Sequence, residues 1–292
     1  MLPKITACCF IRDTYTGAFC LWESMAQIIP LVDEYIVMDC GSTDGTLEEL
    51  ANLAELNPKI KIVHGNLLRT YADGRPDNRV FADLANELVM MAKNEIVFYH
   101  QADEIFHEDL IKILREMLDD SGVGLKEVSF LRYQLKNNFQ EMKWYPHVVK
   151  RIGLKYNFRF TGDGMNAENY GDAPLIGGVS NQDFQTNYKG RETEIDTNKM
   201  ILDVSMTGGF LENILMRRQL HAPIWNEDPN QLYGVAPNGQ PVNTLEWIEE
   251  QRKSGTWNIP ATPFNIPEIM RYHVGKQKYE LRQSVFDTIA NG

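Results

Sequence analysis

Two segments of this chain place acidic residues at or soon after the end of a short apolar run. Residues 36–38 lead into Asp39, and residues 96–99 are followed by Asp103 and Glu104. Short apolar runs are typical of buried strands in a parallel sheet. The carboxyl ends of such strands share one edge of the sheet, where ligands bind, so we expect these acids to converge. Carboxylate oxygens at this edge can accept hydrogen bonds from a ligand or bind a hard divalent cation.

The segment that follows Asp39 has the composition of a turn leading into a helix. Gly41 permits a sharp turn and a close approach of the backbone to a ligand. Thr46 and Glu49 fit a capping box, and apolar residues then recur at helical spacing. The segment therefore predicts strand, turn and helix, with free amides at the start of the helix that could face an anion.

Other short motifs do not fit this segment. Gly41 and Gly45 have the wrong spacing for a dinucleotide fingerprint, and the G-K-[ST] of a P-loop is absent. Residues 40–43 lack the alternating acids of a calcium-binding loop. Taken alone, the segment is equally well explained as a strand-to-helix turn that binds nothing.

Composition narrows the class of protein. The chain has 292 residues, 43% of them hydrophobic, and a formal net charge of −11, which argues against nonspecific nucleic-acid binding. Its four cysteines include no Cys-x-x-Cys pair, so we expect buried thiols in a reducing compartment. We find neither a transmembrane segment nor a secretory signal in the sequence, and we expect a cytoplasmic protein.

The first 110 residues alternate between strand-like and helix-like patterns. This alternation predicts a mostly parallel sheet with helices on both faces. The expected strands are residues 5–11, 35–38, 60–63 and 96–99, and the expected helices are residues 19–29, 46–56, 78–92 and 108–118.

The pattern changes after residue 125. Residues 128–135 and 148–152 predict strands without intervening helices, which indicates an antiparallel extension of the sheet. Later helices are expected at residues 209–220, 244–253 and 278–290, separated by prolines. We expect one α/β domain over residues 1–205 and a helical, loop-rich extension over residues 206–292 packed on it.

Four motifs together resemble family 2 glycosyltransferases of the A-type fold. They are IRD at residues 11–13, IVMDCGSTDGT at 36–46, and NRVFADLAN at 78–86 leading to EIVFYHQADE at 95–104. Their order and spacing match over roughly residues 4–168. The resemblance implies a Rossmann-like, mostly parallel sheet flanked by helices, with 1–205 as the catalytic domain. It also implies transfer of a sugar from a nucleoside diphosphate sugar to a glycan or other hydroxyl acceptor, with inversion.

The resemblance assigns the first acidic segment to the nucleotide. Asp39 would hydrogen-bond the nucleoside, at its base. Ile11, Arg12 and Asp13 would line the nucleotide pocket. Asp44 would be either a secondary contact or a helix cap.

The resemblance assigns the second acidic segment to a metal and the ribose. The family's Asp-x-Asp motif is Gln101-Ala102-Asp103 here. Asp103 takes the place of the aspartate that binds Mn²⁺ or Mg²⁺, and Gln101 takes the place of the one that contacts the ribose. A histidine from the carboxyl-terminal region often completes such a site. His273 is our first candidate and His221 the second, with an ordinary hydrogen-bonded histidine as the alternative for each.

Inverting transfer also requires a general base for the acceptor hydroxyl. Family members carry this acid downstream of the metal motif, where Asp163 and Glu168 are the candidates. A simple turn aspartate is the alternative for Asp163. The arginines nearby, Arg151 and Arg159, could pair with phosphate or with acids.

Two alternative functions remain open from the sequence. Gln101 carries no charge, so the chain could be a catalytically impaired relative that binds nucleotide sugars. A sugar nucleotidyltransferase shares the sheet type, but residues 10–17 lack the glycine-rich, basic loop of that class.

Overall fold

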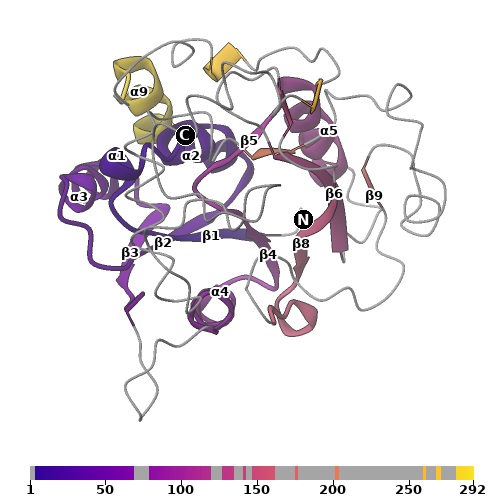
Figure 1. Cartoon of the computed structure of the whole chain (residues 1–292), viewed down its shortest axis with the longest axis horizontal. Coiled ribbons are helices and arrows are strands. Elements are labelled where there is room, and N and C mark those ends of the chain that lie inside the picture. Colours follow the sequence, from indigo (N-terminus) through magenta and orange to yellow (C-terminus); the bar gives the residue numbers. More distant parts are fainter. Residues whose placement is uncertain are drawn as a thin grey trace, which may run out of the picture.

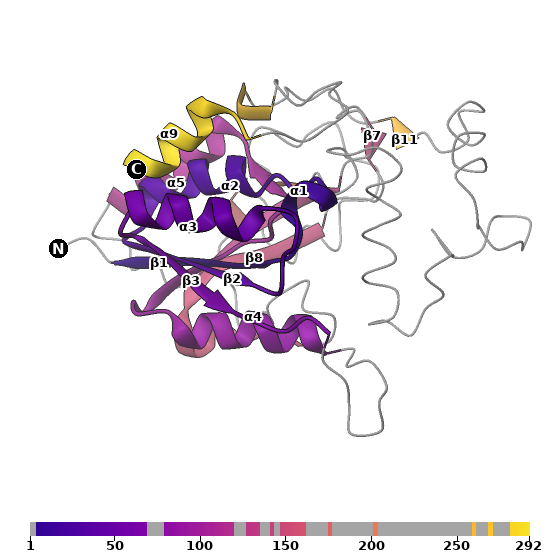
Figure 2. The ribbon, with the colours of Figure 1, turned by 90° about the vertical axis from the view of Figure 1, so that its left-hand side faces the viewer.

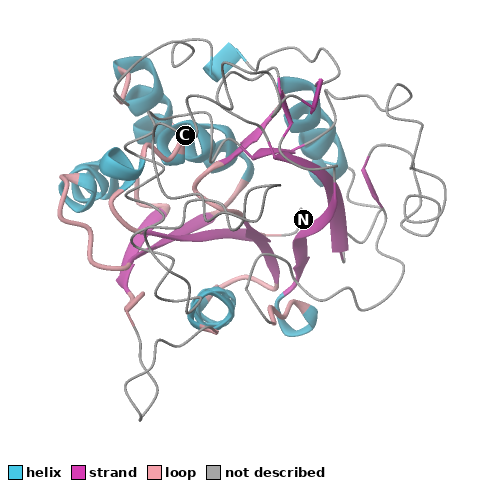
Figure 3. Cartoon of the chain, viewed as in Figure 1, coloured by secondary structure: helices cyan, strands magenta, loops and turns pink. Residues whose placement is uncertain are grey.

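A computed structural model of the chain shows one large twisted sheet between layers of helices (Figures 1 and 3). The structure describes residues 4–68, 79–119, 127–134, 141–142, 147–161, 175–176, 201–203, 259–260, 268–270 and 281–292.

Four parallel strands form the half of the sheet built by the first 100 residues. Their order across the sheet is β3 (Ile60–His64), β2 (Glu34–Asp39), β1 (Ile5–Ile11) and β4 (Ile96–Tyr99). The register pairs Asp39 with Ile11 on one side and with His64 on the other. Because the strands are parallel, the loops that follow β1, β2 and β4 all leave the same edge.

An antiparallel extension continues the sheet beyond β4. It consists of β8 (His147–Leu154), β6 (Glu127–Gln134), β10 (Ile201–Asp203) and β5 (Glu104–Phe106), with β9 (Leu175–Ile176) also paired to β6. β8 runs antiparallel to both β4 and β6. A separate two-stranded pair is formed by β7 (Glu141–Met142) and β11 (Ile259–Pro260). The segment after β4 therefore joins the far side of the extension as β5.

Helices cover both faces of the sheet (Figure 2). One face carries α2 (Leu21–Ile28), α3 (Thr46–Leu56), α5 (Glu108–Asp119) and α9 (Gln283–Asn291), and the other carries α4 (Val80–Met91). The side chains of β1 alternate between these layers, since Ala7 and Cys9 join the first core and Cys8 joins the second. Apolar residues on both faces are what a buried parallel strand requires.

Short helical turns lie between these elements. They are α1 (Thr14–Gly17), η1 (Ile29–Leu31), η2 (Lys155–Asn157) and η5 (Glu268–Met270). Pro30 lies within η1, so α2 stops at Ile28 rather than continuing to residue 29 as predicted.

The carboxyl-terminal helix α9 is hydrogen-bonded to the loop between α3 and β3. The Asn57 side chain donates to the carbonyl of Ile289 at 2.6 Å, and Lys59 Nζ donates to the carbonyl of Gly292 at 2.6 Å. Val285 and Ile289 are buried in the same core as α2 and α3. Residues far apart in the sequence thus share one packing layer.

The predicted fold class is confirmed: a mostly parallel α/β sheet, helices on both faces, an antiparallel extension and a carboxyl-terminal helix. The boundary predicted at residue 205 and the helices predicted at 209–220 and 244–253 lie outside the described residues. The four cysteines are buried and free, as predicted, and burial raises the pKa of Cys9 to about 12.

Within the described residues we find no helix with the length and apolar character that crossing a bilayer requires. The predicted cytoplasmic location stays a prediction.

Candidate functional site

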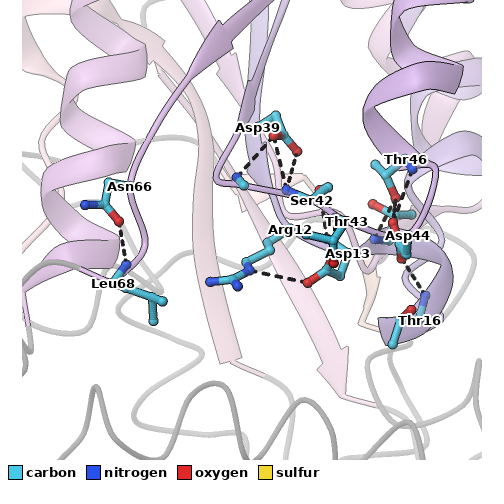
Figure 4. Close-up of polar contacts among 12 residues, drawn as sticks. Arg12, Asp13, Thr16, Asp39, Ser42, Thr43, Asp44, Thr46, Asn66 and Leu68 are labelled. Atoms are coloured by element: carbon cyan, nitrogen blue, oxygen red, sulfur yellow. Dashed lines mark hydrogen bonds and ion pairs between the residues drawn. The ribbon is translucent and has the colours of Figure 1, made fainter.

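The carboxylate of Asp39 organises the turn that follows β2. Asp39 is 2% exposed, and it accepts hydrogen bonds from the amide of Gly41 at 3.1 Å and from the amide of Ser42 at 3.2 and 3.3 Å. Gly41 has a φ of 90°, a conformation that glycine adopts without a steric penalty. The predicted nucleoside-binding carboxylate therefore also fixes its own turn (Figure 4).

Asp13 joins the turn after β1 to the turn after β2. Its Oδ1 accepts from the Thr43 amide at 2.7 Å, and its own amide donates to Ser42 Oγ at 2.9 Å. Its Oδ2 accepts from Arg12 Nε at 3.3 Å, and Figure 4 shows the rest of that guanidinium pointing away from Asp44. Asp13 itself has a φ of 48°, unusual for a residue with a side chain. The two loops therefore form one cross-linked unit.

Asp44 acts as a cap for two helices at once. Its Oδ2 accepts from the Thr16 amide in α1 at 2.7 Å, and its Oδ1 accepts from the amide and hydroxyl of Thr46 at 3.2 and 2.6 Å. The structure shows the capping role predicted for Asp44, and its alternative role as a secondary contact stays a prediction. Gly45 is the N-cap of α3 and makes no side-chain cap bond, so the capping box predicted for Thr46 and Glu49 is wrong. Asp44 satisfies the first amide instead.

The turn after β4 is closed by two hydrogen bonds. The Glu104 amide donates to the carbonyl of Gln101 at 3.1 Å, and the Gln101 amide donates to Glu104 Oε2 at 3.1 Å. Ala102 is buried at the centre of this turn, whereas Asp103 is partly exposed. Asp103, the predicted metal ligand, is thus more exposed than its neighbours Ala102 and Glu104.

Glu104 belongs to a buried cluster of charges rather than to the exposed edge. Arg151 binds its carboxylate through Nε at 2.8 Å and Nη2 at 2.6 Å. Arg132 Nη1 contacts Glu104 Oε1 at 3.2 Å and Gln101 Oε1 at 2.8 Å. Burial alone would raise the pKa of Glu104, but the two arginines outweigh it and lower that pKa to about 2. Of the two acids after β4, Glu104 is paired in this cluster, and the metal-binding role of Asp103 stays a prediction. Gln101 is engaged by Arg132, and its ribose contact stays a prediction.

His100 packs in the core behind the turn. Its Nδ1 lies 3.0 Å from Ser24 Oγ, and its Nε2 is hydrogen-bonded to the Tyr35 hydroxyl. Burial lowers the pKa of His100 to about 4, so the ring is neutral at neutral pH. His107 accepts from the Asp109 amide at 3.2 Å at the start of α5. Both histidines thus make hydrogen bonds that stabilise the fold around the turn.

Of the predicted metal ligands, Asp103 alone lies within the described residues. Asp103 offers carboxylate oxygens, the donors that Mn²⁺ and Mg²⁺ prefer. Among the described residues, no three histidine, cysteine, aspartate or glutamate side chains gather to hold a metal ion. Further ligands would come from a bound diphosphate or from other parts of the chain. His273, His221, Asp163 and Glu168 lie outside the described residues.

Several residues that build the site were not singled out from the sequence. Ser42 and Thr43 bind Asp13, and Arg132 binds both Gln101 and Glu104. For Arg132 a signal was present, since it is a charged residue within the strand segment EVSFLRYQ. For the hydroxyls of the turn, no pattern in the sequence identifies their partner.

Comparison with known proteins identifies a family and several similar structures. The model of glycosyl transferase family 2 matches residues 18–178, just over half of the 292 residues. A structure of S. aureus TarS is 14% identical with a TM-score of 0.36, and the match covers 76% of this chain and 43% of that one.

Two further solved structures were found in complex with ligands. The mannosyltransferase PcManGT from Pyrobaculum calidifontis, with GDP-Man and Mn²⁺, is 19% identical with a TM-score of 0.31, covering 47% of this chain and 36% of that one. Glucosyl-3-phosphoglycerate synthase from Mycobacterium tuberculosis, with Mn²⁺, UDP and glucosyl-3-phosphoglycerate, is 16% identical with a TM-score of 0.26, covering 46% and 44%. The chain spans less than half the length of each of these three proteins. No curated protein sequence matches.

Proposed function

This chain belongs to glycosyl transferase family 2, and from that premise we propose that it transfers a sugar from a nucleoside diphosphate sugar to a hydroxyl acceptor, with inversion. One observation carries the proposal. Asp39 and the turn bearing Asp103 follow two parallel strands that lie on either side of β1, so both face the same edge. Strands two places apart are separated by about 10 Å, a span suited to a nucleotide.

The nucleoside would bind at the cross-linked loops after β1 and β2. Asp39 would accept a hydrogen bond from the base, with Ile11, Arg12 and Asp13 lining the pocket. Asp39 already holds two backbone amides, and a carboxylate has roughly four acceptor sites, so it can accept another bond. Asp13 accepts a hydrogen bond from Arg12 Nε. This bond would orient the guanidinium toward a ligand at this edge.

Asp103 would hold Mn²⁺ or Mg²⁺ together with the diphosphate, and His273 is the candidate for a further ligand. When bound, the cation would neutralise the charge that develops on the leaving diphosphate. Gln101 and Ala102 would lie beside the ribose. Support for this arrangement comes from the partial exposure of Asp103 on a turn closed by two hydrogen bonds.

The acceptor hydroxyl would attack the anomeric carbon as the bond from that carbon to the diphosphate oxygen breaks. Asp163 or Glu168 would accept the hydroxyl proton as general base. Attack opposite to the leaving group inverts the anomeric configuration. A glycan or another hydroxyl compound would serve as acceptor, and the proposed catalytic domain is residues 1–205.

A second candidate is a relative that binds nucleotide sugars without turnover. The observation in its favour is that position 101 carries an uncharged glutamine whose side-chain oxygen is engaged by Arg132. Membership of a glycosyltransferase family disfavours the nucleotidyltransferase alternative.

The test is a panel of UDP- and GDP-linked sugars incubated with the full chain and Mn²⁺, Mg²⁺ or a chelator. We expect release of the nucleoside diphosphate from one donor, stimulated by the metal and by hydroxyl acceptors, and NMR of the product should show an inverted anomeric centre. Tight nucleotide binding without release from any donor would favour the nonturnover relative instead.

A further inference from the structure

Three charged side chains are buried together beneath the turn that presents Asp103. Glu104 and Arg151 are 0% exposed and Arg132 is 2% exposed. We call these three residues the Glu104 cluster. Burying a charge costs several kcal/mol unless it is well paired, so a cluster of this kind places strict demands on geometry.

The cluster is hydrogen-bonded to both the backbone and the side chain of Gln101 in the turn. Glu104 Oε2 accepts from the Gln101 amide at 3.1 Å, while Arg132 Nη1 bridges Gln101 Oε1 at 2.8 Å and Glu104 Oε1 at 3.2 Å. Asp103 lies between these two anchored residues. Its backbone position is therefore set by contacts to Gln101 and Glu104.

The arginines come from the antiparallel extension, not from the strands that form the nucleotide edge. Arg132 lies on β6 and Arg151 on β8, and β8 pairs directly with β4. The paired guanidinium of Arg151 uses two nitrogens on one carboxylate, a geometry that restricts the rotation of Glu104. The extension is thus connected to the metal-ligand turn through fixed side chains.

We propose that Glu104 is a positioning residue: held by Arg132 and Arg151, it fixes the turn 101–104 so that Asp103 is presented to a metal-bound diphosphate. This inference rests on the function proposed above. Residues that orient metal ligands through hydrogen bonds commonly change metal affinity by about 10–100-fold when they are altered.

A second buried glutamate supplies a matched control. Glu34 begins β2, at the opposite end of the strand from Asp39, and is 4% exposed. It accepts from Thr6 Oγ1 and the Lys93 amide, both at 2.8 Å, and pairs with Lys61. Glu34 therefore resembles Glu104 in burial and pairing but has no contact with the candidate site.

The experiment compares Glu104→Gln, Arg132→Lys and Glu34→Gln in the full chain, well below the unfolding temperature of each variant. Mn²⁺ affinity is measured by electron paramagnetic resonance with UDP or GDP present, and stability by urea unfolding. We expect Glu104→Gln and Glu34→Gln both to lose stability. Only the variants of the cluster should weaken Mn²⁺ binding, by about 10-fold or more.

Arg132→Lys keeps the test informative if Glu104→Gln does not fold, because lysine keeps the charge but cannot reproduce a guanidinium bridge. Unchanged Mn²⁺ affinity in both cluster variants, or equal weakening in Glu34→Gln, would overturn the positioning role alone. A wild-type chain that binds no Mn²⁺ with either nucleotide would overturn the proposed function and the positioning role with it.

Discussion

The two acid-bearing turns at the edge of the sheet are stabilised in different ways. The turn after β2 is held by backbone amides and hydroxyls from its own residues and from the loop after β1. The turn after β4 is held by Arg132 and Arg151, which follow Glu104 by 28 and 47 residues and are buried. Hydrogen bonds from backbone amides and hydroxyls hold the first turn, and buried arginines hold the second.

This difference predicts how strongly a single substitution in each turn lowers the stability of the protein. Hydrogen bonds from backbone amides to a carboxylate contribute about 1.5–3 kcal/mol each, and the loss of one leaves several others in place. Removal of one member of a buried charge pair leaves a charge without compensation and costs about 3–5 kcal/mol. The turn after β2 should therefore tolerate single changes that the turn after β4 does not.

The largest expected effect is on activity, from Asp103→Asn. Loss of the charged ligand should lower the transfer rate at least about 100-fold, because the metal would no longer be held against the leaving diphosphate. Initial rates with the donor identified in the panel measure this. Asp109→Asn, at an exposed acid on α5, is the control and should retain activity. Equal rates for Asp103→Asn and wild type would show that Asp103 has no role in catalysis.

The next largest effect is on stability, from Arg151→Met. Its removal should lower the free energy of unfolding by about 3–5 kcal/mol, because the buried Glu104 carboxylate would lose the partner that binds both of its oxygens. Lys61→Met is the control, since Lys61 is 53% exposed and its partner Glu34 keeps two other donors. Urea unfolding at pH 7 measures both variants. A loss below about 1 kcal/mol for Arg151→Met would show that the two turns do not differ as described.

We expect the free energy of unfolding to depend on pH through His100, which packs behind the turn after β4. Its folded pKa of about 4 lies below the ordinary value of 6.5, so the unfolded chain binds the extra proton between these values. Stability contributed by the neutral ring is present above pH 6.5 and is lost as the pH falls toward 4, by roughly 3 kcal/mol in total. Urea unfolding of wild type and His100→Gln between pH 7.5 and 4.5 isolates this contribution. Parallel pH profiles for the two proteins would contradict it.

The smallest effect is expected at the first turn, from Gly41→Ala. No atom lies within 4 Å of a Cβ added at Gly41, so the cost comes from its φ of 90° alone and should be about 1–2 kcal/mol. Gly41→Asn should cost less, because asparagine tolerates positive φ better than alanine. Thermal unfolding of both variants measures the difference. Equal losses would indicate that some contact other than backbone conformation governs this turn.

The bounds of the elements around the two turns were largely predictable from the sequence. The partners of Glu104 in the turn after β4 were not. The apolar runs gave β1 and β4 their observed bounds, and the spacing of apolar residues gave α3 its bounds. These signals depend on neighbouring residues. The identity of Asp39 as a strand-end acid followed from the same pattern.

The ion pairs of Glu104 could not be predicted from local patterns in the sequence. The sequence predicts that Asp103 and Glu104 both lie at the edge of the sheet, and only the register of β6 and β8 brings Arg132 and Arg151 onto Glu104. The same applies to Asp13, whose partner Thr43 comes from the next loop. Pairing across strands and loops is set by tertiary packing, so residue type alone could not assign these side chains.

The central claim is that the shared edge of β2 and β4 binds a metal-bound nucleotide, with Asp103 on the metal. A crystal structure of the chain soaked with Mn²⁺ and the nucleoside diphosphate released from its donor tests this directly. We predict anomalous scattering from an ion coordinated by Asp103, with the nucleoside beside Asp39. An ion or nucleotide bound elsewhere, away from both aspartates, would contradict the claim.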